Sequence, residues 1–211
     1  MIATPNSIRA APRFPVVTRT LDNGLRLVVV EDPGAQRVEL GAQQDRGARL
    51  VAVRLSFHAG SADDPPSLAG CAHLAEHLAT QGTEAFPRRE VTRRVKRRGG
   101  ALSAMTWFDW TSFAQVVPPA HLEEALRVEA DRLRRLLPSL SAGKLAAERR
   151  VVANERRQNV EGRPLGAVHE TLRRHAFPPG HPYRRAILGR PESLEGSERE
   201  HVVRVVSAHQ R

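Results

Sequence analysis

Residues that could carry out chemistry gather in the stretch 71–80, which reads CAHLAEHLAT. His73, Glu76 and His77 within it have H-x-x-E-H spacing. On an α-helix, at about 100° per residue, these three side chains fall within an arc of roughly 100° and face one small volume. Two imidazoles suit Zn²⁺, and the carboxylate beside them could take a proton from a water at the metal. The alternative is an amphipathic helix that carries two histidines and no metal.

The element that positions these residues is predicted to be a helix, because the stretch is rich in Leu and Ala and holds no Pro or Gly. Two histidines do not complete a zinc site, which needs three protein ligands and an open position for water. A second predicted helix, at 141–160, carries Glu148 and Glu155. They are seven residues apart and lie within roughly 20° on one side of that helix. Both are candidates for the remaining ligand.

Composition limits the classes of protein that need to be considered. The chain has 211 residues, 40% hydrophobic and 27% charged, which is typical of a globular protein. Its single cysteine, Cys71, excludes an internal disulfide and a multi-thiolate zinc site, so a metal must be held by His and carboxylate. No apolar run is long enough to span a membrane, and we expect no membrane partner. Residues 1–15 lack the apolar core of a secretory signal, which predicts a cytoplasmic location.

The charge balance is basic, at +10 from 33 Lys and Arg against 23 Asp and Glu. Such a charge permits binding to nucleic acid or to acidic proteins, and it can also reflect an Arg-favouring genome. The densest basic stretch is the predicted helix at 87–98. Because it has no interleaved aromatic residues, we interpret it as a solvated helix face, and nucleic-acid binding remains the weaker alternative.

The pattern of elements indicates the fold class. Asn23-Gly24 between two β-prone runs predicts a hairpin, and residues 31–48 read as a loop. Strands and helices follow without βαβ alternation, so the class is α+β, with an antiparallel sheet packed against several helices. We expect a loose arm at 1–16 and one domain at 17–211. Strands are predicted at 49–57, 101–106 and 111–117, and helices at 71–80, 87–98, 119–137, 141–160, 164–176 and 197–209.

These motifs resemble the N-terminal half of the pitrilysin-type (M16, insulinase or inverzincin) metallopeptidases. In that family H-x-x-E-H is followed some 75 residues later by a liganding Glu in a run like E-R-x-V-V-x-x-E. Here the run is ERRVVANE, from Glu148 to Glu155. The resemblance extends over about 17–208. Further matching stretches are NGL at 23–25, FHAGS at 57–61, GT at 82–83, GGA at 99–101 and HPY at 181–183.

The resemblance implies a zinc-dependent endopeptidase that hydrolyses peptide bonds. His73, His77 and Glu155 would bind Zn²⁺, Glu76 would be the general base, and Glu148 would orient a ligand. A peptide substrate would add as a strand to the sheet edge formed by 101–106. Its contacts would include Ala101, Ser103 and Ala104, and Ser103 stands where the family usually has Asn.

Family members build the working enzyme from two homologous domains, in one chain or two. The second domain supplies an Arg and a Tyr that hold the substrate and stabilise the oxyanion. The sequence ends at Arg211, about where the family's domain would enter its last strand. We therefore expect the catalytic half of a zinc peptidase working with a second M16-like domain or subunit. The alternative is a non-catalytic subunit that keeps the fold for assembly.

Overall fold

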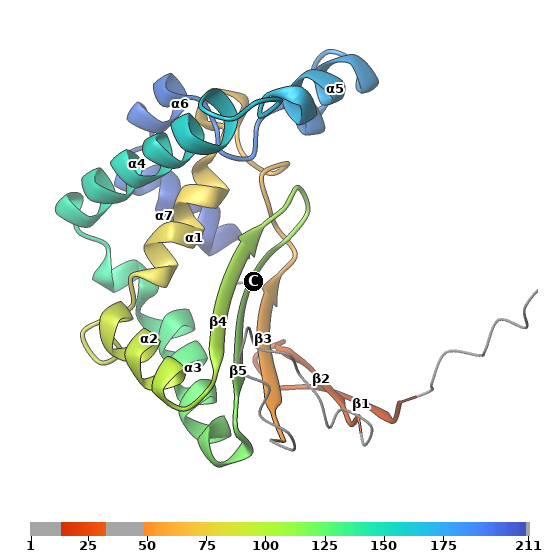
Figure 1. The fold of residues 1–211 in the computed structure, drawn as a ribbon, viewed down its shortest axis with the longest axis vertical. Coiled ribbons are helices and arrows are strands. Elements are labelled where there is room, and N and C mark those ends of the chain that lie inside the picture. The colour runs from red at the N-terminus through yellow and green to blue at the C-terminus, as the bar shows by residue number, and fades with distance from the viewer. Residues whose placement is uncertain (1–13, 33–48, 210–211) are drawn as a thin grey trace, which may run out of the picture.

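The computed structural model describes residues 14–32 and 49–209, with side chains up to Ser207. The architecture is α+β, as the sequence predicts, and the helices lie on one side of an antiparallel sheet (Figure 1). The strands are β1 (Val16–Thr20), β2 (Arg26–Val30), β3 (Val51–Phe57), β4 (Ala101–Thr106) and β5 (Thr111–Val117). The α-helices are α1 (Cys71–Thr80), α2 (Arg88–Arg97), α3 (Leu122–Ser139), α4 (Ala142–Arg156), α5 (Val168–Ala176), α6 (Pro191–Glu195) and α7 (Arg199–His209). Short 3₁₀ turns occupy Pro66–Leu68, Pro119–His121 and Pro182–Arg184.

The main sheet has the strand order β3-β5-β4, with both pairs antiparallel. Within the described residues β4 is therefore an edge strand. The β4–β5 hairpin turns through Phe108 and Asp109, where the N–H of Trp107 donates to the carbonyl of Trp110 at 2.8 Å. Strands β1 and β2 form a separate two-stranded hairpin, and Gly24 adopts the positive φ of +83° that its turn requires.

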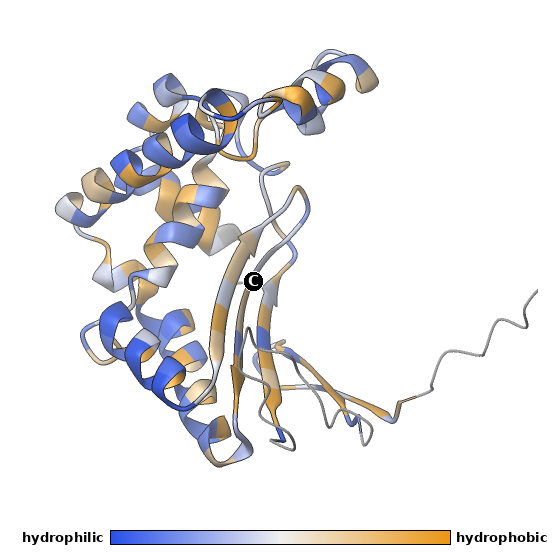
Figure 2. Cartoon of the chain, viewed as in Figure 1, coloured by the Kyte–Doolittle hydropathy of each residue, from blue (hydrophilic) through white to orange (hydrophobic). Residues whose placement is uncertain are grey.

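The core lies between the helix-facing side of the sheet and α1. This helix is buried on nearly every side, because α4, α7 and β4 all pack against it. Leu74 and Leu78 meet Phe113 of β5 within one apolar cluster, to which Val152 of α4 and Val202 of α7 also belong. Figure 2 shows the apolar residues along α1 and on the facing elements. Because α1 is packed on several sides, its side chains are held in fixed orientations.

The strands and most helices match their predicted positions within a few residues, but four details differ. The helix predicted at 119–137 continues as α3 through Pro138 to Ser139. Since Pro138 sits in the last turn, its missing N–H costs only a terminal hydrogen bond. The helix predicted at 141–160 widens into a π-helix at Arg157–Glu161. The helix predicted at 164–176 begins only at Val168, after Leu165 at φ +61°. The short helix α6 was not predicted.

Some predicted segments fall on residues outside the described ranges. The arm at 1–16 lies there up to residue 13, and its last residue, Val16, begins β1. Most of the loop at 31–48 also lies outside the described ranges. Among the helices that the structure describes, none combines the length and apolarity needed to cross a bilayer.

Candidate metal centre

Helix α1 carries His73, Glu76 and His77, and a carboxylate from the preceding loop fixes its first turn. The Asp64 side chain accepts hydrogen bonds from the N–H groups of Gly70 (2.8 Å) and Ala72 (2.9 Å). These are among the N–H groups that an α-helix leaves unsatisfied at its start. Gly70 has φ +97°, and a Cβ there would lie 2.7 Å from the Cα of Gly189. Glycine is thus required where the 189 loop meets the start of α1.

Helix α4 brings Glu155 to the two histidines. Its Oε2 lies 3.2 Å from Nε2 of His77 and 3.9 Å from Nε2 of His73. One ligand atom from each residue lies within 4.8 Å of the others. Tetrahedral zinc at its usual bond lengths places ligand atoms about 3.3 Å apart. The His77–Glu155 separation of 3.2 Å matches this value and the His73–Glu155 separation of 3.9 Å is longer, so the donor set fits the metal with His73 placed farther out.

Glu148 lies two turns before Glu155 on α4 and contacts the other ring nitrogen of His77. Its Oε2 is 3.3 Å from Nδ1 of His77, and its Oε1 accepts a hydrogen bond from Nε2 of Gln81 at 2.5 Å. With a proton on Nδ1, Nε2 is the His77 nitrogen that remains for a metal. Gln81 was not predicted as part of the site. Its position four residues after His77, on the same helix face, was the available signal.

The electrostatics of the cluster favour a bound cation. Burial lowers the pKa of His73, and the neighbouring His77 lowers it further, which keeps this imidazole neutral. Burial also opposes charge on His77, yet Glu155, Glu76 and Glu148 together outweigh it and raise the pKa of His77. The hydrogen bond with His77 lowers the pKa of Glu155. Two imidazoles therefore face three carboxylates, those of Glu76, Glu148 and Glu155.

Glu76 is buried where α1 meets β4. Thr106, the last residue of β4, donates from its hydroxyl to Glu76 Oε2 at 2.7 Å. Thr111 lies opposite Thr106 in the register and donates to the carbonyl of Ala59 at 3.0 Å. Burial raises the pKa of Glu76, and the Thr106 hydrogen bond partly offsets this. Thr106 was expected only as part of a strand, since no sequence spacing links it to Glu76.

A groove of about 390 Å³ runs from Glu76 and His77 between β4, α1 and α2. Of the three residues predicted to contact substrate, Ser103 and Ala104 line it, whereas Ala101 does not. The Trp107–Trp110 hydrogen bond sets the alternation of the β4–β5 ladder. It follows that Leu102, Ala104 and Thr106 direct their backbone polar groups to the free edge of β4. Ala101 and Ser103 direct theirs to β5.

Comparison with known proteins assigns the family. Residues 41–189 match the sequence model of the Insulinase family (peptidase family M16), so the chain belongs to this family of peptidases. It is 28% identical over 176 residues to the zinc protease PqqE of Helicobacter pylori, covering 83% of this chain and 36% of that protein. It is also 28% identical over 209 residues to a probable mitochondrial-processing peptidase subunit beta of Arabidopsis thaliana, covering 99% of this chain and 36% of that protein.

Solved structures agree with the fold. A protease from Helicobacter pylori superposes with a TM-score of 0.78 at 25% identity, over 94% of this chain and 44% of that one. Pitrilysin superposes with a TM-score of 0.71 at 22% identity, over 98% of this chain and 21% of that one. This likeness concerns the fold alone. The chain thus spans about a third of the length of the curated relatives named here.

Proposed function

We propose that this chain is the metal-binding catalytic half of a zinc-dependent endopeptidase. The observation that carries the proposal is the convergence of His73, His77 and Glu155. Their ligand atoms lie within 4.8 Å of one another although the residues come from two helices far apart in sequence. Membership in a peptidase family supports the reaction class, peptide-bond hydrolysis.

Each residue has a distinct task in this proposal. His73, His77 and Glu155 hold Zn²⁺, and Glu148 keeps the His77 ring oriented. Bound zinc supplies Lewis acidity, which polarises a peptide carbonyl and lowers the pKa of a water. Glu76 takes the proton of the attacking water and delivers it to the departing amine. Thr106 holds the Glu76 carboxylate in place through its hydroxyl.

The substrate in this proposal is a peptide that extends the sheet at β4. Among the residues that the structure describes, nothing pairs with the backbone groups of Ala104 and Thr106 at this edge, next to Glu76. A free edge recognises extended peptides by strand addition. The groove beside β4 would accept side chains of the added strand.

A second candidate function is that of a non-catalytic subunit within a larger assembly. Its support is the word "subunit" in the name of the Arabidopsis thaliana protein. Both candidates include a further M16-like domain or chain as partner.

Metal analysis and peptide hydrolysis separate the two candidates. We expect about one zinc per chain in wild type and in Glu76→Gln, because Glu76 is not a proposed ligand. Hydrolysis, measured alone and with a companion chain that carries a second M16-like domain, should fall roughly 10²- to 10⁴-fold in Glu76→Gln. Wild type without zinc would refute the enzyme proposal. Zinc without hydrolysis in any combination would favour the subunit.

A further inference from the structure

Helix α2 borders the groove beside β4 and contributes cationic side chains to it. Arg88 and Lys96 are exposed and line the groove, together with Leu102, Ser103 and Ala104 of β4. Neither cation has a side-chain hydrogen bond or ion pair with any residue of the described ranges. Two unpaired positive charges thus border the space that leads to Glu76 and His77.

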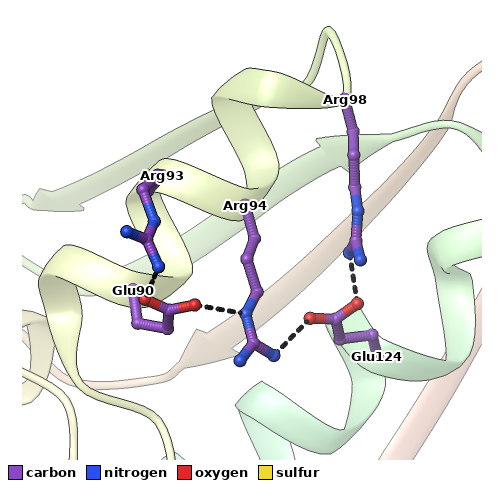
Figure 3. A network of polar contacts seen from close by, with 5 residues as sticks. All are labelled: Glu90, Arg93, Arg94, Arg98 and Glu124. Carbon is purple, nitrogen blue, oxygen red and sulfur yellow. Dashed lines mark hydrogen bonds and ion pairs between the residues drawn. The ribbon is translucent and has the colours of Figure 1, made fainter.

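Three neighbouring arginines, Arg93, Arg94 and Arg98, already have partners. Figure 3 shows Arg93 and Arg94 on the carboxylate of Glu90, and Arg94 and Arg98 on that of Glu124. The latter pairs join the C-terminal half of α2 to the start of α3. Arg88 and Lys96 lie outside this network, so their charges remain available to a ligand.

The remaining charged groups of the groove do not neutralise these two cations. Asp131 receives a hydrogen bond from Thr83 and pairs with Arg135 at 3.3 Å. Arg132 pairs with Glu129 at 2.8 Å. Glu76 and His77 belong to the metal centre at the other end. The α2 side of the groove therefore presents net positive charge to whatever enters it.

Strand geometry indicates which part of a bound peptide would meet that charge. Leu102 and Ala104 face the helices, since they are cross-strand neighbours of Gln115 and Phe113, which are buried beneath α3 and α1. In a strand added to the edge of β4, the residues opposite Leu102 and Ala104 point to the same face. Their side chains would enter the groove between β4 and α2.

We propose that this groove selects peptides with an acidic side chain, Asp or Glu, at the position that faces Arg88 and Lys96. The inference rests on the proposed function for the mode of peptide binding. It adds the substrate class, and it assigns Arg88 and Lys96 as specificity-determining residues. Exposed ion pairs contribute modestly, so two of them correspond to a preference of roughly 3- to 30-fold.

The test uses the full chain as Glu76→Gln, loaded with zinc, so that binding is measured without turnover. Fluorescent peptides would carry Glu or the isosteric Gln at one position, moved along the sequence, and their affinities would be read by anisotropy. We expect the Glu peptide to bind more tightly by the stated factor at one position, with the preference shrinking as salt rises. Adding Arg88→Glu and Lys96→Glu should reverse the preference toward Lys.

The matched control is Arg89→Glu with Arg97→Glu. Both residues lie on α2, are exposed, and do not line the groove. Because this pair also replaces two cations by two Glu, it changes the net charge by the same amount. This control should keep the preference for Glu. Equal affinity of Glu and Gln peptides at every position, no peptide binding by zinc-loaded protein, or equal effects of the two charge-reversed pairs would overturn the inference. Absence of zinc would instead refute the proposed function, and a preference for Glu that persists without zinc would still support the groove.

Discussion

In the proposed metal site, the Glu148 carboxylate favours a proton on Nδ1 of His77 and leaves Nε2 for the metal. It lies 3.3 Å from Nδ1, and Gln81 holds its other oxygen. Glu148→Gln keeps the size of the side chain but removes the charge that favours a proton on Nδ1. We expect zinc affinity to fall roughly 10- to 100-fold, as is usual for groups that orient a metal ligand.

The measurement for Glu148→Gln is competition with a chromophoric chelator. Glu123→Gln is the control, because it removes an equal charge from an exposed position on α3, far from the centre. An unchanged zinc affinity in Glu148→Gln would show that His77 is oriented without this carboxylate.

Thr106 presents a second prediction at the residue scale. Its hydroxyl donates at 2.7 Å to Glu76, and a single hydrogen bond to a charged group contributes about 1.5–3 kcal/mol. Thr106→Val keeps the shape but removes the donor, so kcat of the active assembly should fall about 10-fold or more with KM and zinc content little changed. Thr106→Ser restores the donor and should recover most of kcat. Equal losses in the Val and Ser variants would instead point to packing.

At the scale of elements, the first turn of α1 depends on Asp64. Burial raises the pKa of Asp64 from 3.8 to about 7, although backbone N–H groups of α1 and Arg185 oppose this rise. The folded chain therefore retains a proton that the unfolded chain releases. Through this group the free energy of unfolding decreases as pH rises from about 4 to 7. The rise in the pKa of Asp64 from 3.8 to about 7 corresponds to a loss of roughly 4 kcal/mol at most in unfolding free energy.

Asp64→Asn removes this titration. Urea unfolding of both proteins across pH 4 to 7 gives the difference in unfolding free energy, in which other titrating groups cancel. We expect wild type to lose stability relative to Asp64→Asn as pH rises. Asp63→Asn is the control. The Asp63 carboxylate lies next to Asp64 in sequence but accepts a hydrogen bond from the N–H of Gly60 and does not contact the start of α1. A flat difference would contradict the prediction.

The predicted elements show where sequence patterns suffice and where they do not. Helix α1 and strands β4 and β5 agree with their predicted bounds, since uninterrupted periodicity and the Gly99-Gly100 break define them locally. The π-helix at Arg157–Glu161 was not predicted, because no residue type marks the change of hydrogen bonding. Helix α6 has only five residues, too few to show a period.

The candidate site likewise has residues that sequence motifs identify and contacts that they do not. H-x-x-E-H and the ERRVVANE run marked the residues that the structure brings together, because each run is local to one helix. The contact of Thr106 with Glu76 joins two different elements, and that of Asp64 with Gly70 depends on how the loop before α1 folds back on the helix start. Only the packing of α1 against β4 and the preceding loop creates them, so a single sequence carries no spacing that reports them.

At the scale of the whole molecule, aromatic and polar contacts link the sheet to the segment that follows α4. Phe108, in the β4–β5 turn, stacks on Tyr183 with ring centroids 4.5 Å apart, and Tyr183 donates a hydrogen bond to Asp109. Arg156 of α4 binds Glu170 of α5 through both of its terminal nitrogens. Arg173 of α5 also lies over the Phe108 ring, so α5 is held to the sheet turn on one side and to the residue following Glu155 on the other.

Phe108→Ala should therefore release one side of this connection. Phe108 is 7% exposed, and its truncation removes the stack on Tyr183 and the contact with Arg173, whose guanidinium lies 5.3 Å from the ring centroid. We expect a loss of about 3 kcal/mol in unfolding free energy, together with faster hydrogen exchange across α5 and residues 177–184. Trp107→Ala is the control, because that neighbouring ring is 50% exposed and its loss should cost far less. If α5 keeps its protection while the chain is destabilised, the aromatic contact belongs to the sheet turn alone, and Arg156 by itself holds α5 in place.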